Sequence, residues 1–91
     1  MKDKEKIYLD KVVGSIVRGT RIDYDNDKIH YPFPTLSSSF YSFLLHIQTT
    51  PPLRLLRSFT EYCKNTFGLT DDEIKYVWNQ YRKILINKIE N

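Results

Sequence analysis

One long segment without charge restricts the fold of this chain more than any other feature. Between Ile29 and Leu53 there is no Asp, Glu, Lys or Arg, whereas charged residues are scattered through the sequence on both sides. The segment is rich in large apolar side chains, which are Tyr31, Phe33, Phe40, Tyr41, Phe43, Leu44, Leu45 and Ile47. Because water solvates such a segment poorly, we expect it to be buried in the core or against a partner. The pattern therefore favours a binding function over catalysis.

The length and the composition set further limits. A chain of 91 residues predicts a single small domain over residues 1–91, which is too small for a deep catalytic cleft. The net charge of +3 is mildly basic and is weak evidence for a polyanionic partner. The single cysteine, Cys63, excludes an intrachain disulfide and argues against a secreted, disulfide-stabilised scaffold. Residues 1–6 alternate in charge and no apolar run is long enough to span a membrane, so we expect a cytoplasmic, intracellular protein.

Hydrophobic periodicity predicts the order of the secondary-structure elements. The expected elements are a helix over residues 3–18, a β-ribbon over 20–33, and helices over 36–48, 51–67 and 70–90. The β-branched residues of the first segment favour a strand, but its apolar side chains recur at helical spacing. The predicted fold is therefore mainly α, a compact single-domain bundle of about four helices with a small two-stranded β-ribbon between the first and second helices.

The β-ribbon is predicted from a change of period. Apolar and polar residues alternate on both sides of Asp25-Asn26-Asp27, a sequence typical of turns. A loop over residues 25–28 would pair Tyr24 with Ile29 and Ile22 with Tyr31. This register places all four apolar side chains on one face of the ribbon.

Capping residues and apolar stripes define the remaining helices. Residues 37–39 are serines that offer caps for the second helix, Thr50 offers one for the third, and residues 70–73 form a capping box for the last. Leu36 begins the apolar stripe of the second helix. The residues at the centres of the stripes, predicted to be buried together, are Phe43, Phe59, Trp78 and Tyr81.

Several patterns resemble metal or catalytic sites without completing them. Asp23, Asp25 and Asp27 have the spacing of the first calcium-loop ligands, but Lys28 and Pro34 stand where that loop needs glycine and glutamate. The triplet is better explained as an acidic turn. The residues His30, His46 and Cys63 lack the spacing of a metal site or of a Cys–His pair. We predict no metal, no cofactor, no small-molecule substrate and no enzymatic activity.

Basic residues of the last two helices give one hypothesis of function. The basic candidates on the exposed faces are Arg54, Arg57, Lys64, Lys75 and Arg82. The third helix follows a break after the second, an arrangement similar to a helix-turn-helix that enters the major groove. Two prolines in the turn and Glu61 within the basic face depart from that pattern. Nucleic-acid binding is therefore the alternative hypothesis, and an ordinary solvated helix face is the simpler explanation.

Apolar residues that fall outside the core stripes give the preferred hypothesis. Tyr41 and Leu45 lie off the stripe of the second helix, and Tyr76 and Ile86 lie off that of the last helix. Exposed apolar residues that gather in a patch mark a protein interface. We therefore predict a non-enzymatic binding module, an accessory or adaptor subunit that docks on a larger protein or self-associates. The structural alternative is that the ribbon or the first helix covers Tyr41 and Leu45.

Overall fold

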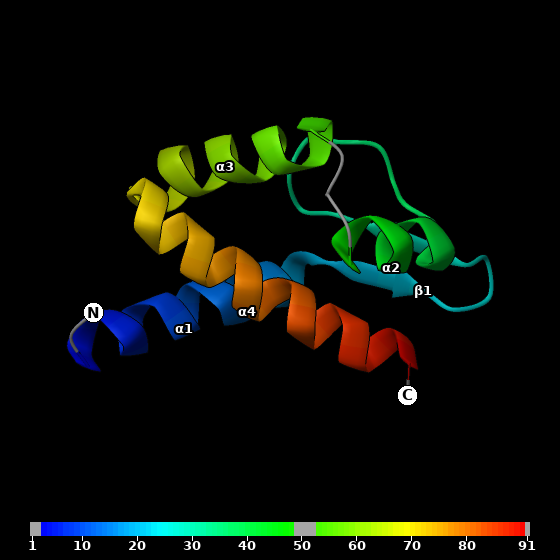
Figure 1. The fold of residues 1–91 in the computed structure, drawn as a ribbon, viewed down its shortest axis with the longest axis horizontal. Helices are drawn as coiled ribbons and strands as arrows, with labels where there is room; N and C mark the ends of the chain where they lie inside the picture. Colours follow the sequence, from blue (N-terminus) through cyan, green and yellow to red (C-terminus); the bar gives the residue numbers. More distant parts are fainter. Residues whose placement is uncertain (1–2, 49–52, 91) are drawn as a thin grey trace.

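Two long helices, one from each end of the chain, pack across each other at the base of the fold (Figure 1). The computed structural model describes residues 3–48 and 53–90, without the side chains of residues 46–48. The described elements are α1 (Asp3–Gly19), β1 (Arg21–Asp23), β2 (Lys28–His30), α2 (Phe40–Gln48), α3 (Leu53–Phe67) and α4 (Asp71–Glu90). The protein is a mainly helical compact domain with an antiparallel hairpin between its first and second helices, which confirms the predicted fold class.

The α1 and α4 helices make the most extensive helix–helix contact. The α1 helix contributes Leu9, Val12, Val13 and Ile16, which are all at most 3% exposed. Its β-branched residues are helical because the stripe they form is buried, which outweighs their small intrinsic preference for strands. At the end of α1, the hydroxyl groups of Thr20 and Tyr81 lie 2.7 Å apart, so the polar tip of the buried Tyr81 has a partner.

The start of α4 confirms the predicted capping box. The Thr70 amide donates to Glu73 Oε1 at 2.8 Å, and the Glu73 amide donates to Thr70 Oγ1 at 3.3 Å. Both bonds satisfy amides that the helix itself leaves without an acceptor. The buried stripe of α4 then follows the predicted spacing and consists of Ile74, Val77, Trp78, Tyr81 and Leu85.

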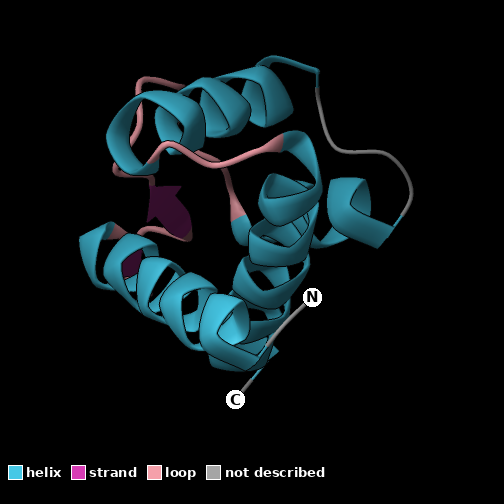
Figure 2. Cartoon of the chain, turned by 90° about the vertical axis from the view of Figure 1, so that its left-hand side faces the viewer, coloured by secondary structure: helices cyan, strands magenta, loops and turns pink. Residues whose placement is uncertain are grey.

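The α3 helix lies in a separate layer above α1 and most of α4 (Figure 2). Phe59 is its central core residue, fully buried between Phe33, Trp78 and Tyr81, with ring centroids 4.9–5.6 Å away. Gly68 ends the helix in a left-handed conformation with φ of 66°, and its amide donates to the Lys64 carbonyl. The predicted central core residues, Phe43, Phe59, Trp78 and Tyr81, are all buried, which confirms the helix phases.

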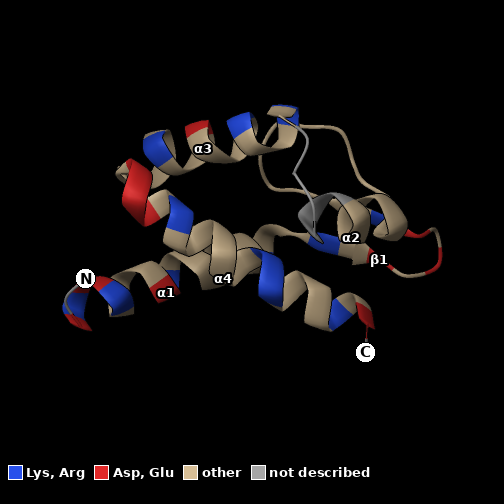
Figure 3. Ribbon diagram, in the orientation of Figure 1, with Lys and Arg blue, Asp and Glu red and all other residues tan. Residues whose placement is uncertain are grey.

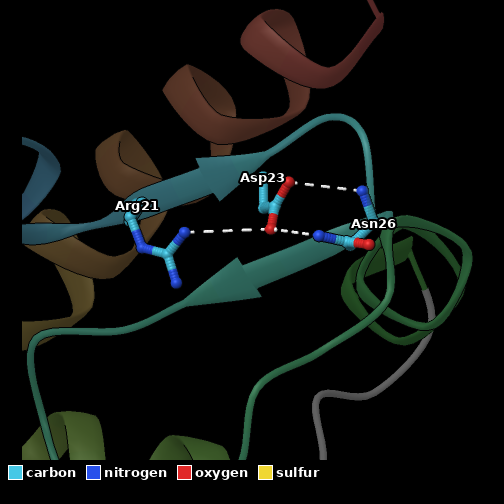
Figure 4. Close-up of polar contacts among 3 residues, drawn as sticks. All are labelled: Arg21, Asp23 and Asn26. Atoms are coloured by element: carbon cyan, nitrogen blue, oxygen red, sulfur yellow. Dashed lines mark hydrogen bonds and ion pairs between the residues drawn. The ribbon is translucent and has the colours of Figure 1, made fainter.

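The hairpin has a different register from the predicted one. Ile22 faces Ile29, Arg21 faces His30 and Asp23 faces Lys28, so the predicted pairs Tyr24–Ile29 and Ile22–Tyr31 are wrong. The turn begins one residue earlier because Asp23 accepts hydrogen bonds from the amide and the side chain of Asn26, at 3.2 and 2.8 Å (Figure 4).

Asp27 completes the turn and also reaches α2. Its φ of 57° is in the left-handed region, which Asp tolerates better than most residues. Its carboxylate accepts the amide of Phe40 at 3.2 Å, at the first residue of α2. The acidic turn therefore supplies a negative charge to a helix that has no acid in its own first turn.

The α2 helix begins at Phe40, later than predicted. Ser38 forms an antiparallel bridge with Ile29, through bonds of 2.7 and 3.1 Å, which holds residue 38 in an extended conformation. Ser39 is the cap, since its Oγ accepts the amide of Ser42 at 3.1 Å. Leu36 therefore precedes the helix, and its exposed fraction of 78% corrects its predicted place on the inner stripe. The predicted cap Thr50 lies outside the described residues.

Candidate functional site

An exposed apolar surface lies on one side of α2. Tyr41 is 73% exposed and Leu45, one helical turn later, is 45% exposed. Phe43, on the opposite side of the same helix, is 2% exposed, so α2 is anchored in the core while it presents Tyr41 outward. The helix contains no charged residue. We refer to Tyr41 and Leu45 as the α2 face. In the described structure neither the hairpin nor α1 covers these two side chains, so the structural alternative given above is wrong.

The two predicted partner residues of α4 occupy a different environment. Tyr76 and Ile86 are half-buried and pack against the hydrophobic core. The Tyr76 hydroxyl donates to Asp10 Oδ1 of α1 at 2.8 Å, and this hydrogen bond raises the pKa of Tyr76. Both residues therefore contribute to internal packing, which makes them weaker candidates for an anchor than Tyr41.

A groove that the sequence did not reveal lies between the loop before α2 and the first two turns of α3. It encloses a cavity of about 470 Å³. We refer to it as the arginine groove; its lining residues are Pro34, Thr35, Leu36, Ser37 and Ser38 from the loop and Arg54, Leu55, Arg57 and Ser58 from α3. The predicted basic residues Arg54 and Arg57 thus gain apolar and hydroxyl neighbours that are distant in sequence.

Two contacts fix the loop that forms one wall of this groove. Phe33 is 3% exposed and packs against Phe59 and Tyr62 of α3, with ring centroids 5.6 and 5.8 Å away. At the other end, the bridge between Ser38 and Ile29 ties the loop to the hairpin. The segment between these anchors spans the groove wall. No sequence motif signals this arrangement, because it depends on how Phe33 meets a helix that follows much later in the chain.

The predicted basic residues do not form one continuous surface. Within the described part of the chain, Arg54 and Arg57 are exposed and take part in no ion pair. Lys64, on the same helix, pairs with Asp71 at 3.1 Å, and the Nε of the half-buried Arg82 donates to Asn79 at 3.2 Å. Figure 3 shows an acidic residue between the basic residues of α3 and acidic residues in the first turn of α4. Of the three basic residues on α3, Arg54 and Arg57 are therefore the two without an acidic partner among the described residues.

Lys75 belongs to a second groove between α3 and α4. This groove is lined by Leu56, Thr60, Asp71, Ile74, Lys75 and Trp78. Asp71 lines this groove too, so the groove contains an acidic side chain, unlike the described lining of the arginine groove. Lys75 therefore lies apart from the two arginines of the arginine groove.

The candidate metal ligands have structural roles. Hydrogen bonds from Asn26 lower the pKa of Asp23, and Arg21 lies 3.8 Å from its carboxylate. Asp27 caps α2, as described above. Among the described residues, no three or more His, Cys, Asp or Glu side chains are grouped to hold a metal ion.

Cys63 is fully buried on the inner side of α3. Burial raises the pKa of its thiol to about 12, so the thiol stays protonated at neutral pH. This environment is that of a small core residue. His30 is half-buried on β2, and the side chain of His46 lies outside the described residues.

Comparison with known proteins adds no further constraint. No protein-family model, no curated protein and no solved structure matches the chain. The described helices include none that is long and apolar enough to cross a membrane. The candidate binding surfaces of the described structure are therefore the α2 face and the arginine groove.

Proposed function

We propose that the chain is a non-enzymatic binding module, an accessory or adaptor subunit that docks on a larger protein through the α2 face. The observation that carries the proposal is the 73% exposure of Tyr41 on a helix without charge. Tyrosine is enriched among the residues that dominate protein interfaces, because it supplies a large rigid contact area and a polar tip. Leu45 extends the apolar surface by one turn.

The expected affinity change follows from the size of a buried aromatic anchor. Such an anchor contributes about 2 kcal/mol or more to an interface, so Tyr41→Ala should weaken association by about thirtyfold or more. The variant should keep its fold, since an exposed side chain contributes little to stability. Ile7→Ala is a matched control: Ile7 is 59% exposed, and it belongs to α1 at the opposite end of the molecule from α2 (Figure 1).

The test begins with affinity capture from the native host, with nuclease treatment and at two salt concentrations. A protein captured by the wild type and by Ile7→Ala, but lost with Tyr41→Ala, is then purified and its affinity for the three chains is measured. The proposal predicts a thirtyfold loss for Tyr41→Ala alone. Equal binding of the partner by both variants and the wild type contradicts the proposal. Size-exclusion chromatography with light scattering identifies self-association as the outcome if the partner is a second copy.

Nucleic-acid binding is the second candidate function, favoured by the two exposed arginines of α3. If Arg54 and Arg57 contact phosphates, retardation of DNA or RNA should be lost in Arg54→Glu/Arg57→Glu and should weaken steeply with salt. Docking through the α2 face is apolar and should depend little on salt. Absence of retardation of any DNA or RNA at low salt excludes this candidate.

A further inference from the structure

The arginine groove combines an apolar interior with positive charge on its edge. Pro34 and Leu36 line it from the loop, and Leu55, which is 5% exposed, lines it from α3. Leu36 is 78% exposed although it lines a cavity, so a ligand in the groove would remove it from water. A cavity of about 470 Å³ is within the size range of small-ligand sites and is therefore large enough to admit a peptide side chain.

The charge in the groove calls for an anionic ligand. Arg54 and Arg57 both line it, and they are three residues apart on one helix, so their side chains are neighbours that repel each other. No acidic residue is among the described lining residues, and neither arginine is in an ion pair within the described ranges. The first turn of α3 also has no acid. A carboxylate bound here would relieve this repulsion and accept hydrogen bonds from a guanidinium.

Hydroxyl groups complete the polar lining. Thr35 and Ser37 from the loop and Ser58 from α3 face the same cavity. Hydroxyl groups both donate and accept hydrogen bonds, so they suit the backbone amides and carbonyls of an extended peptide. An apolar side chain of such a peptide would contact Pro34, Leu36 and Leu55.

We propose that the arginine groove binds a short acidic and aliphatic peptide segment, with an apolar side chain in the cavity and flanking carboxylates on Arg54 and Arg57. The inference rests on the proposed function in one respect, because the segment belongs to a protein partner. A peptide fits better than a nucleic acid. A phosphate backbone is bound by several basic residues along a surface, whereas here Lys64 is paired with Asp71 and the cavity between the arginines and the loop has apolar and hydroxyl lining.

The test is selection of a random-peptide display library on the intact protein, followed by fluorescence anisotropy with the enriched peptides. The proposal predicts enrichment of sequences in which Leu, Ile or Phe is flanked by Asp or Glu. Arg54→Gln/Arg57→Gln should weaken these peptides about tenfold, because two exposed ion pairs contribute up to about fivefold each. Leu36→Ser should also weaken binding, and it should keep the fold because Leu36 is exposed.

Matched controls separate the groove from general charge effects. Lys11→Gln/Lys83→Gln removes two positive charges from exposed positions outside the groove and should leave peptide affinity unchanged. Tyr41→Ala should also leave it unchanged, since Tyr41 does not line the groove. If Tyr41→Ala loses partner docking but the wild type binds none of the selected peptides, this inference is overturned and the proposed function still stands.

Three outcomes overturn the proposal. The first is a selection that enriches no acidic and aliphatic sequence. The second is equal loss of affinity in the arginine double variant and in Lys11→Gln/Lys83→Gln, which would mean that net charge alone drives binding. The third is a single-stranded DNA or RNA oligonucleotide that binds more tightly than the peptides and displaces them, which would assign the groove to nucleic acid.

Discussion

Phe59 is the residue whose truncation should damage this fold most. It is fully buried, and its ring lies 4.9 Å from Trp78, 5.6 Å from Tyr81 and 5.6 Å from Phe33, measured between ring centroids. These neighbours come from α4 and from the loop after β2, so Phe59 joins three parts of the chain. Phe59→Ala removes the ring that they share and leaves a cavity among rigid aromatic side chains.

The size of the effect can be worked out from this environment. Truncation of a buried Phe to Ala costs about 3–5 kcal/mol, from lost burial and from the remaining cavity. A chain of 91 residues has a free energy of unfolding of about 5–14 kcal/mol at the usual value per residue. For a domain of this size, each kcal/mol lowers the melting temperature by about 4–8 °C, so the loss is about 12–40 °C. If the free energy of unfolding of the wild type is near about 5 kcal/mol, the variant should be partly or wholly unfolded at 37 °C.

Urea unfolding measured by fluorescence reports on the same site, because Trp78 is the only tryptophan and contacts Phe59. Circular dichroism gives an independent measure of the loss of helix. Phe59→Leu should lose less stability, since leucine leaves a smaller cavity. Tyr41→Ala should change stability by less than about 0.5 kcal/mol, because Tyr41 is exposed. A Phe59→Ala chain that melts within a few degrees of the wild type would refute the central place of Phe59 in the core.

Three further predictions concern protonation and capping. Hydrogen bonds from Asn26 lower the pKa of Asp23 below 3.8 in the folded state, so their stabilisation is present above pH 3.8 and is lost as the pH falls below it. Acid unfolding curves of wild type and Asp23→Asn should therefore converge at low pH; a constant difference in stability at every pH argues against this effect. Burial raises the pKa of Cys63 to about 12, so an aromatic disulfide reagent at pH 8 should react with it only after unfolding in guanidinium; reaction of the native protein at the unfolded rate contradicts this burial. Thr70→Ala removes the acceptor for the Glu73 amide and should lower the free energy of unfolding by about 1 kcal/mol in urea titrations, whereas Thr70→Ser should retain most of it.

The helices α1, α3 and α4 could be predicted from the sequence because each one buries a regular stripe. Leu9, Val12, Val13 and Ile16 of α1 are all buried, as their spacing predicts. The capping box at Thr70 could also be predicted from the sequence, since both of its partners lie within one turn. In local patterns of this kind, residues that are close in sequence determine the structure. A buried stripe and a short-range cap need no knowledge of the rest of the chain.

The hairpin register and the start of α2 could not be predicted, because distant or competing contacts decide them. Tyr24 was expected to pair with Ile29, but the side chain of Asp23 bonds to Asn26 and starts the turn earlier. Ser38 was expected to be helical, but a bridge to Ile29 keeps it extended. In both places a side-chain or long-range hydrogen bond outweighs hydrophobic periodicity.

Only part of the candidate site could be predicted from the sequence, because the rest depends on long-range contacts. The sequence identified Tyr41 and Leu45 by their angular position on one helix, and it placed Arg54 and Arg57 among five basic candidates on the last two helices. It could not show that Leu36 and Arg57 line one groove, because this depends on Phe33 packing against α3. Tyr76 and Ile86 show the limit of the same angular argument, since a residue away from the main stripe still packs when a neighbouring helix is close.

The segment without charge now divides into two groups of residues with different explanations. Ile29, Phe33 and Phe43 are at most 3% exposed, so the hydrophobic core accounts for their composition. The core does not account for Leu36 at 78% exposure or Tyr41 at 73%, because polar residues at these positions would leave the core packing intact and improve solubility. A solvated loop and helix face have no physical need for leucine and tyrosine. Binding would account for both residues, since Leu36 lines the arginine groove and Tyr41 belongs to the α2 face, the two surfaces for which binding is proposed.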